Sequence, residues 1–282
     1  MGGTEERQAS GLAEVARGLA SLHTEYYGKG PATARAYMVD DTMVCFLEGG
    51  FTTVEKTLIA DDNTQAVEAI RRHFQQAMEG PFRDVVETAT ARQVVAYMSQ
   101  IHTGPDLAVE LFVLEPTAEP PVGGHEQGSV ADRDGGGQTE TDRRPSSPLD
   151  GVRHSPAKGE DLASISTGLV QLHRRYYGKG PTKAKTFLVP DAIICLLRGG
   201  FTAVERTLID DGNVDAVYDI RRSFQGAMEG HFTGVVEEVM GRRVVAYMSQ
   251  IHQDPDLAVE LFVLEPTGEK IFAQHEEELA EG

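Results

Sequence analysis

The sequence predicts an α+β protein built from two copies of one domain. Residues 21–117 reappear without a gap as residues 171–267, and a repeat of this length is a whole domain rather than a solenoid unit of roughly 20 to 50 residues. Within each copy, helical and β-rich patterns follow one another in the order α-β-β-α-α-β-β. Strands that pair as hairpins predict a mainly antiparallel four-stranded sheet, with the helices on one face.

Composition divides the chain into segments. Its 282 residues fit two compact domains of about 100 residues each. The stretch between them is rich in Gly, Pro, Ser and charged residues and cannot bury enough surface to offset its ordering entropy. We expect a flexible N-terminus at 1–10, a first domain at 11–117, a disordered linker at 118–158, a second domain at 159–267 and an acidic tail at 268–282.

The first helix of each repeat is predicted from apolar residues spaced three or four apart. In the first copy these are Leu12, Val15, Leu19 and Leu22. The helix should end in the loop 28–31, where glycine suits the C-terminal cap and proline prevents continuation. Two short strands should follow near 35–39 and 43–47, with a turn between them.

The middle of the repeat is predicted to be helical. Thr52 and Glu55 have the spacing of a capping box, in which each side chain satisfies a free backbone N–H at a helix start. A longer helix should begin near residue 63, with its buried face formed by Val67, Ile70, Phe74 and Met78. Gly80-Pro81 should break or kink this helix. Two β-rich runs, 94–102 and 107–114, then close the repeat as a hairpin.

The face of the sheet that carries no helices needs cover, and the second copy could supply it. We therefore expect an intramolecular pseudo-dimer. The sequence leaves open whether the two domains pair within one chain or between chains as a homo-oligomer.

The net charge and the cysteines of the chain indicate which partners and which cellular compartment to expect. A net charge of −18 argues against binding to nucleic acid or to anionic lipid, which both depend on a basic surface. Cys45 and Cys195 lie within apolar runs and are expected to be buried free thiols in a reducing compartment. No apolar segment approaches the roughly 18 residues of a membrane span, and the N-terminus lacks a signal-peptide pattern. These features predict a cytoplasmic protein.

One candidate site is the loop Tyr-Tyr-Gly-Lys-Gly-Pro, which ends with Pro31 in the first repeat and recurs unchanged in the second. Its glycines and its lysine, Lys29 or Lys179, could hold a small anion or a nucleotide. The loop lacks the spacing of a P-loop and follows a helix C-terminus, whose dipole repels anions. A purely structural helix stop is therefore the competing interpretation.

The remaining candidate binding residues are basic. Arg35 is matched by Lys185, and Lys183 adds to this cluster, which could meet a phosphate or an acidic partner or could be a solvated strand edge. A pair of arginines on the long helix is expected to point sideways or outward, where it could grip a partner's carboxylates or form ion pairs within the domain. In the two repeats these are Arg71, Arg72, Arg221 and Arg222.

No pattern predicts catalysis, a metal site or a cofactor. The capping-box position accounts for Glu55 and Glu205. The only histidines present in both copies, His23, His102, His173 and His252, lack metal-ligand spacing. Because no nucleophile with a base and no unexplained pair of carboxylates is present, we do not expect an enzyme.

The order of these motifs resembles a known bacterial family. Each repeat has the Tyr-Tyr-Gly-Lys-Gly-Pro loop, the Asp41 turn, Gly50-Phe51-Thr52-x-x-Glu55-x-x-Leu58, Arg71-x-x-Phe74 and the ending 111–115. In these features it is similar to the MpsC-like family, formerly a domain of unknown function. The resemblance implies an accessory or regulatory protein that binds the membrane subunits of a Na+-translocating system generating membrane potential, peripherally at the inner face of the membrane. Anion or nucleotide binding by the loop is the alternative, and RNA binding a weaker third.

Overall fold

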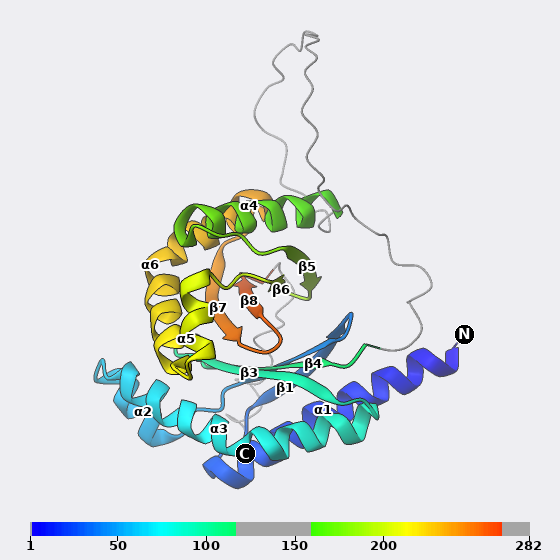
Figure 1. Ribbon diagram of the computed structural model, residues 1–282. Coiled ribbons are helices and arrows are strands. Elements are labelled where there is room, and N and C mark those ends of the chain that lie inside the picture. Colours follow the sequence, from blue (N-terminus) through cyan, green and yellow to red (C-terminus); the bar gives the residue numbers. More distant parts are fainter. Residues whose placement is uncertain (1, 117–158, 267–282) are drawn as a thin grey trace, which may run out of the picture.

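The computed structural model describes residues 2–116 and 159–266, with side chains from residue 10 onward. Two four-stranded sheets lie face to face at the centre, and helices cover the outer face of each (Figure 1). The expected linker and acidic tail lie outside the described residues. None of the helices in these two ranges is both long and apolar enough to cross a membrane.

The first repeat has the predicted order of elements. These are α1 (Gly2–Tyr27), β1 (Thr33–Val39), β2 (Thr42–Glu48), α2 (Thr53–Ala60), α3 (Thr64–Thr90), β3 (Val94–His102) and β4 (Leu107–Leu114). Helix α1 begins at Gly2, so residues 2–10, expected to be a flexible N-terminus, are helical. It ends before Gly28, whose φ of 71° is the left-handed conformation that glycine adopts without strain.

The second repeat matches the first element by element. It contains α4 (Gly159–Tyr177), β5 (Lys183–Val189), β6 (Ala192–Arg198), α5 (Ala203–Asp210), α6 (Val214–Met240), β7 (Val244–His252) and β8 (Leu257–Leu264). The strand orders are β1-β2-β4-β3 and β5-β6-β8-β7, with every neighbouring pair antiparallel. The two helices between β2 and β3 let β4 return beside β2, so the last strand of each repeat is central.

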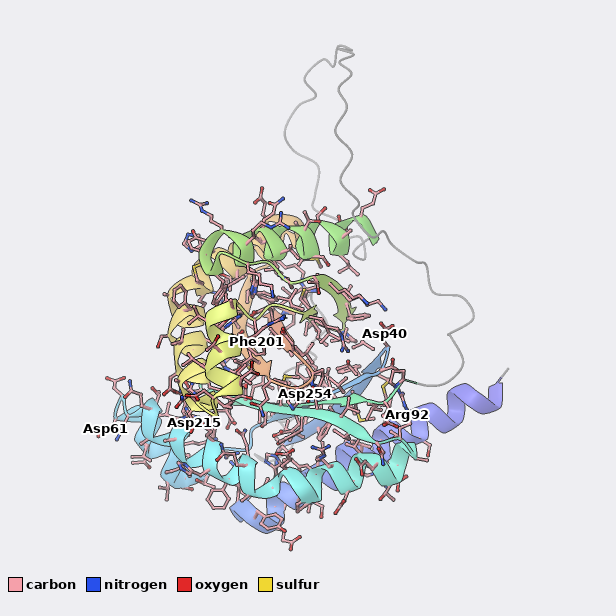
Figure 2. All side chains as sticks on the ribbon, viewed as in Figure 1. Asp40, Asp61, Arg92, Phe201, Asp215 and Asp254 are labelled. Atoms are coloured by element: carbon pink, nitrogen blue, oxygen red, sulfur yellow. The ribbon has the colours of Figure 1, made fainter. Side chains whose placement is uncertain are left out.

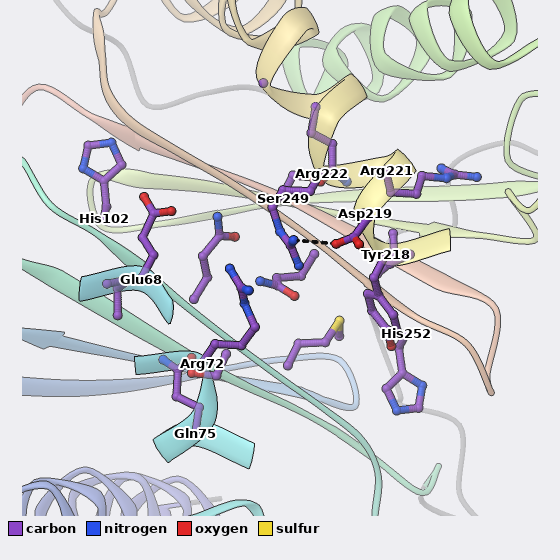
Figure 3. A pocket seen from close by; sticks show the side chains of 18 of the residues that line it. Glu68, Arg72, Gln75, His102, Tyr218, Asp219, Arg221, Arg222, Ser249 and His252 are labelled. Carbon is purple, nitrogen blue, oxygen red and sulfur yellow. Dashed lines mark hydrogen bonds and ion pairs between the residues drawn. The ribbon is translucent and has the colours of Figure 1, made fainter. Parts of the chain in front are cut away.

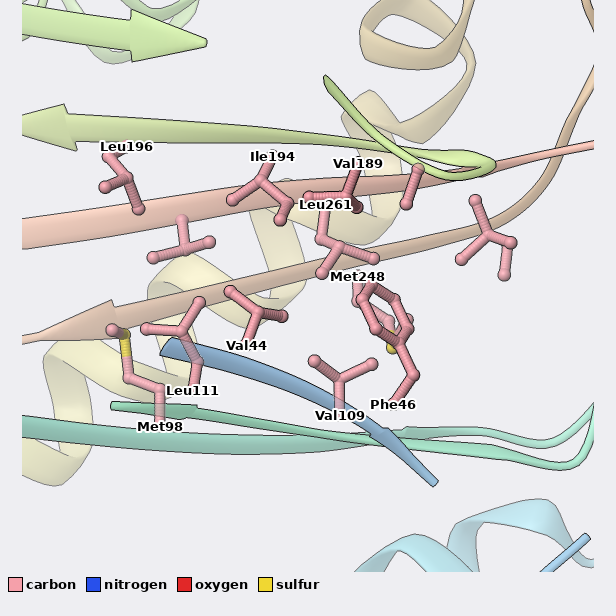
Figure 4. Packing of buried hydrophobic residues seen from close by; sticks show 14 of the residues in the cluster. Val44, Phe46, Met98, Val109, Leu111, Val189, Ile194, Leu196, Met248 and Leu261 are labelled. Atoms are coloured by element: carbon pink, nitrogen blue, oxygen red, sulfur yellow. The ribbon is translucent and has the colours of Figure 1, made fainter. Parts of the chain in front are cut away.

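The two central strands of each sheet are buried on both faces. Residues alternate along a strand between the two sides of a sheet. In β2, Met43 and Cys45 pack under the helices, whereas Val44 and Phe46 face the other repeat. The side chains that face the other repeat form one apolar core between the two sheets. Figure 4 shows Val44, Val109 and Leu111 opposite Ile194, Leu196 and Leu261 in this core. The predicted intramolecular pseudo-dimer is therefore confirmed.

The predicted buried face of α3 was wrong in two positions. Ile70 and Phe74 are 42% and 39% exposed. The buried residues are Val67, Arg71, Gln75, Met78, Phe82 and Val86, which follow an equally good three-or-four spacing. Because Arg71 and Gln75 in this series are polar, apolar periodicity alone did not identify the buried face.

Gly80-Pro81 was predicted to break or kink the helix, and a break does not occur, because α3 continues through Pro81 to Thr90. A proline inside a helix costs about 3 kcal/mol. Met78, Phe82 and Val86 are at most 1% exposed on either side of it, and burying each such side chain contributes about 1.5 to 3 kcal/mol. Packing therefore outweighs the lost backbone hydrogen bond.

Candidate functional site

The family motifs of each repeat converge on one buried arginine. Arg71 is 1% exposed. Its Nη2 donates to Glu55 Oε2 at 2.8 Å and to the Gly50 carbonyl at 2.9 Å, and its Nε donates to Glu55 Oε1. The guanidinium carbon lies 4.0 Å from the centre of the Tyr27 ring. Each of these contacts recurs at Arg221.

The expectation that Arg71 and Arg221 point sideways or outward was therefore wrong, and they form ion pairs within the domain, which was the alternative interpretation. The buried carboxylate of the capping box fixes them inside the domain, where a partner's carboxylates would have to displace Glu55 or Glu205. The prediction of a capping box is confirmed in both repeats, with the Thr52 N–H donating to Glu55 at 2.7 Å. The same glutamate thus begins one helix and anchors the next.

The glycine-lysine loop closes onto this arrangement. Lys29 Nζ donates to the Phe51 carbonyl at 2.8 Å, and Lys179 Nζ donates to the Phe201 carbonyl at 2.6 Å. The Phe51 N–H donates to the Asp106 carboxylate at 3.2 Å. The lysine and the aspartate therefore hold one peptide segment from both ends, and the geometry favours the helix-stop interpretation over anion binding.

The electrostatics keep the central carboxylates ionised. Burial would raise the pKa of Glu55, but hydrogen bonds from Arg71 and from the Thr52 backbone lower it overall. The pKa of Glu205 is lowered in the same way. Burial raises the pKa of Tyr27 and takes that of Tyr177 to about 12, so both phenols are neutral near pH 7.

A second buried polar cluster was missed by sequence reasoning. Glu110 is fully buried in β4, accepts a 2.6 Å hydrogen bond from Tyr97 Oη and lies 3.6 Å from His23 Nε2. Glu260 repeats the arrangement, with the corresponding distances 2.6 and 3.3 Å. The available signal was a lone acid inside an apolar strand, Leu-Ala-Val-Glu-Leu-Phe-Val-Leu, in both copies.

The cysteines flank this cluster from the neighbouring strand. Cys45 pairs with Glu110 in the sheet register, and both Cys45 and Cys195 are buried free thiols, as predicted. Burial raises the pKa of each thiol, to about 12 for Cys195. Such thiols are unreactive.

The residues of the predicted basic cluster lie on the edge strands of the two sheets, β1 and β5. Arg35 lies on the edge strand β1, and Lys183 is exposed at the start of β5. Lys185 crosses to the first repeat and forms an ion pair with Asp40. Figure 2 shows Asp40 at the end of β1, between the two repeats. Lys185 therefore contacts the other half of its own chain.

Each repeat exposes the same three apolar side chains on the outside of its helices. We call these the outer patches: Val54, Ile70 and Phe74 in one repeat, and Val204, Ile220 and Phe224 in the other. The two valines are 69% and 70% exposed, and the remaining four side chains between 39% and 43%. Since Glu55 and Arg71 join α2 to α3, the residues just before them, Val54 and Ile70, are held on adjoining helices.

A polar cavity of about 860 Å³ lies between the repeats. We call it the inter-repeat cavity. Its walls come from α3 and β3 on one side and from α6 and β7 on the other. Arg72 and Arg222 reach into it, whereas Arg221 points away (Figure 3). Equivalent residues of the two repeats line it in pairs, among them Gln75 and Gln225, Ser99 and Ser249, and His102 and His252. Neither loop lysine is among its lining residues.

Within the described ranges, no three His, Cys, Asp or Glu side chains are grouped closely enough to hold a metal ion. The four histidines found in both repeats lie either in the domain interior or in the wall of the inter-repeat cavity. His23 and His173 contact the buried glutamates. His102 and His252 line the inter-repeat cavity.

Comparison with known proteins identifies one family. The profile described as Na+-translocating membrane potential-generating system (MpsC) matches residues 9–116 and again residues 157–266. These two segments cover both domains. No curated protein and no solved structure matches the chain.

Proposed function

The chain belongs to the MpsC family, and from this premise we propose that it is a non-catalytic accessory protein that binds the membrane subunits of a Na+-translocating, membrane-potential-generating system. The observation that carries the proposal is the pair of outer patches. Single exposed apolar residues are ordinary. Here the same three positions are exposed in both halves of the chain.

The outer patches are held on a rigid support. Val54 precedes Glu55 of the capping box, and Ile70 precedes the buried Arg71. The Phe74 ring contacts the Tyr27 ring, with the centroids 5.1 Å apart, and Tyr27 in turn covers Arg71. An apolar surface that is fixed before binding loses little conformational entropy on association. This arrangement suits a surface that receives the apolar side chains of a partner.

Charge indicates what kind of partner the patches suit. Exposed acids stand at the end of α2 and α5, at Asp61 and Asp62 and at Asp210 and Asp211, and the chain as a whole carries −18. Cytoplasmic loops of integral membrane proteins carry an excess of Lys and Arg close to apolar segments. An acidic protein with outward apolar patches is complementary to such loops.

The test is capture of membrane subunits by the tagged full-length chain from detergent-solubilised native membranes. The variant combines Val54→Asp with Val204→Asp, because both side chains are about 70% exposed and contribute little to the fold. The matched control combines Val95→Asp with Leu188→Asp, which are exposed apolar residues outside the patches.

The wild type and the control should retain an integral subunit of an ion-translocating complex, identified by mass spectrometry. The patch variant should lose that subunit while keeping a melting temperature close to the wild type. The proposal fails if the wild type retains no such subunit, or if the patch variant retains it as fully as the control does.

A further inference from the structure

The inter-repeat cavity concentrates unpartnered polar groups. Three residues that line this cavity, Gln75, Gln100 and Gln225, each have a buried side-chain polar atom without a hydrogen-bond partner within the described ranges. Of these, Gln75 and Gln225 are only 7% and 8% exposed. Because buried polar groups are normally hydrogen-bonded, these walls are suited to hydrogen-bond a polar molecule between the repeats.

The charged residues of the cavity break its pseudo-symmetry. Glu68 and Glu229 line the cavity and both act electrostatically on His102, and Figure 3 shows Glu68 on the same side of the cavity as His102. Glu79, the equivalent of Glu229, acts on His252 but forms an ion pair with Arg83. In the second repeat, Tyr218 stands at the position equivalent to Glu68. The cavity therefore has an acidic end beside His102.

The two arginines also differ. Arg222 donates to Asp219 at 2.9 Å, whereas the equivalent of Asp219 in the first repeat is Ala69. Arg72 accordingly has no ion pair or hydrogen bond within the described part of the chain. The cavity thus offers one uncommitted guanidinium and, on the same face of α3 three residues later, the amide of Gln75.

We propose that the inter-repeat cavity binds a small zwitterion of net positive charge, of which a basic amino acid is the simplest example. Its carboxylate would accept hydrogen bonds from Arg72 and Gln75, and its ammonium would lie between Glu68 and Glu229. A guanidinium and a carboxamide are suited to bind a carboxylate.

The lining charges exclude simpler ligands. A plain anion would meet Arg72 but would be repelled by the carboxylates, since Glu68, Asp215 and Glu229 form no ion pair within the described ranges. A plain diamine would satisfy those acids but would face Arg72 with no carboxylate to offer. A ligand that carries both kinds of charge, with the positive one in excess, complements the whole cavity.

The experiment is isothermal titration calorimetry of the full-length chain with lysine, compared with putrescine, glutamate and inorganic phosphate. The variant Arg72→Gln removes the proposed carboxylate partner. Arg222→Gln is the matched control, because its guanidinium lines the same cavity but already binds Asp219. Both arginines are exposed, so neither change should unfold the protein.

Lysine should bind saturably to the wild type and at least about tenfold more weakly to Arg72→Gln, as expected for loss of a charge-assisted contact. The control should stay within about twofold of the wild type. Putrescine, glutamate and phosphate should each bind more weakly than lysine. Absence of saturable lysine binding, equal affinity in Arg72→Gln, or tighter binding of glutamate or phosphate would each overturn the proposal.

This inference is independent of the outer patches. The variant that combines Val54→Asp with Val204→Asp changes no residue of the cavity and should bind lysine as the wild type does. Arg72→Gln should in turn leave capture of membrane subunits unchanged. Failure of either proposal can therefore be distinguished from failure of the other.

Discussion

Arg71 of the first repeat and Arg221 of the second make the same hydrogen bonds to equivalent partners. Asp40, in contrast, forms an ion pair with Lys185, while its counterpart Pro190 has no charge to offer. The opposite pairing, between Arg35 and Pro190, cannot form. The repeats are thus equivalent in their interiors and different where they meet each other and the solvent.

This difference shows which interactions define the domain. A buried charge is costly without its partners, so substitution of Arg71 or of Glu55 alone would leave the other charge buried and unpaired. An exposed residue can change alone, because water replaces whatever partner it loses. The exterior is therefore where the two halves of the chain acquire separate roles, as with Arg72 and Arg222 in the cavity.

The largest effect is expected from the buried arginines. Arg71→Met leaves the Glu55 carboxylate buried without its main partner, which should lower the free energy of unfolding by about 3 to 5 kcal/mol. Arg221→Met should cost a similar amount, and Arg72→Met, on the exposed neighbour, less than about 0.5 kcal/mol. Urea denaturation measures all three. A small loss for Arg71→Met alone would show that the repeats are not equivalent inside.

Acidification should affect both repeats together. Burial lowers the pKa of His102 and of His252 below the ordinary value of 6.5, although the Pro105 and Pro255 carbonyls act the other way. The unfolded chain then binds these protons first, so stability is full above about pH 6.5 and falls as the pH drops. Glu55 and Glu205, with lowered pKa values, add a further loss below their ordinary value of 4.5.

Urea midpoints between pH 8 and pH 4 measure this decline. Replacing both histidines, with His102→Asn and His252→Asn, should flatten the part of the curve between about pH 5 and 7. The decline below pH 4.5 should remain. An unchanged slope between pH 5 and 7 in the double variant would contradict the assignment.

A smaller effect on stability is expected at the C-terminal caps of the two long helices, where the repeats have different residues. Ala91 and Gly241 cap α3 and α6 with φ values of 54° and 61°. A side chain is strained in this conformation, so Ala91→Gly should raise the free energy of unfolding by about 1 kcal/mol and Gly241→Ala should lower it by a similar amount. No atom lies within 4 Å of a Cβ added at Gly241, so backbone strain alone decides the outcome. Changes of the same sign would refute this explanation.

The smallest effect is expected at the contact that only one side of the pseudo-dimer has. The Lys185 and Asp40 side chains are 66% and 39% exposed, and ion pairs at such positions contribute less than about 1 kcal/mol. Lys185→Ala should therefore change stability only slightly, and 0.5 M salt should reduce the difference further. A loss comparable to that of Arg71→Met would mean that the ion pair holds the repeats together.

The long internal repeat in the sequence determined the domain duplication, and local patterns determined the order of elements, the helix start at Thr52 and the stop at Gly28. The local patterns depend on residues within one or two helical turns of each other, where backbone sterics and capping operate. The same patterns predicted the hairpins and therefore the antiparallel sheet. The order of the MpsC motifs could also be recognised in the sequence, but their contacts with the buried arginine could not.

Only the tertiary structure decided which polar residues are buried. Arg71 is interior because Glu55, 16 residues earlier, supplies a carboxylate, and Glu110 because Tyr97 supplies a hydroxyl. Periodicity counts apolar residues, so it assigned Ile70 and Phe74 to the core and overlooked both of these. The inter-repeat cavity likewise depends on how two sheets stack, a long-range arrangement that no window of sequence contains.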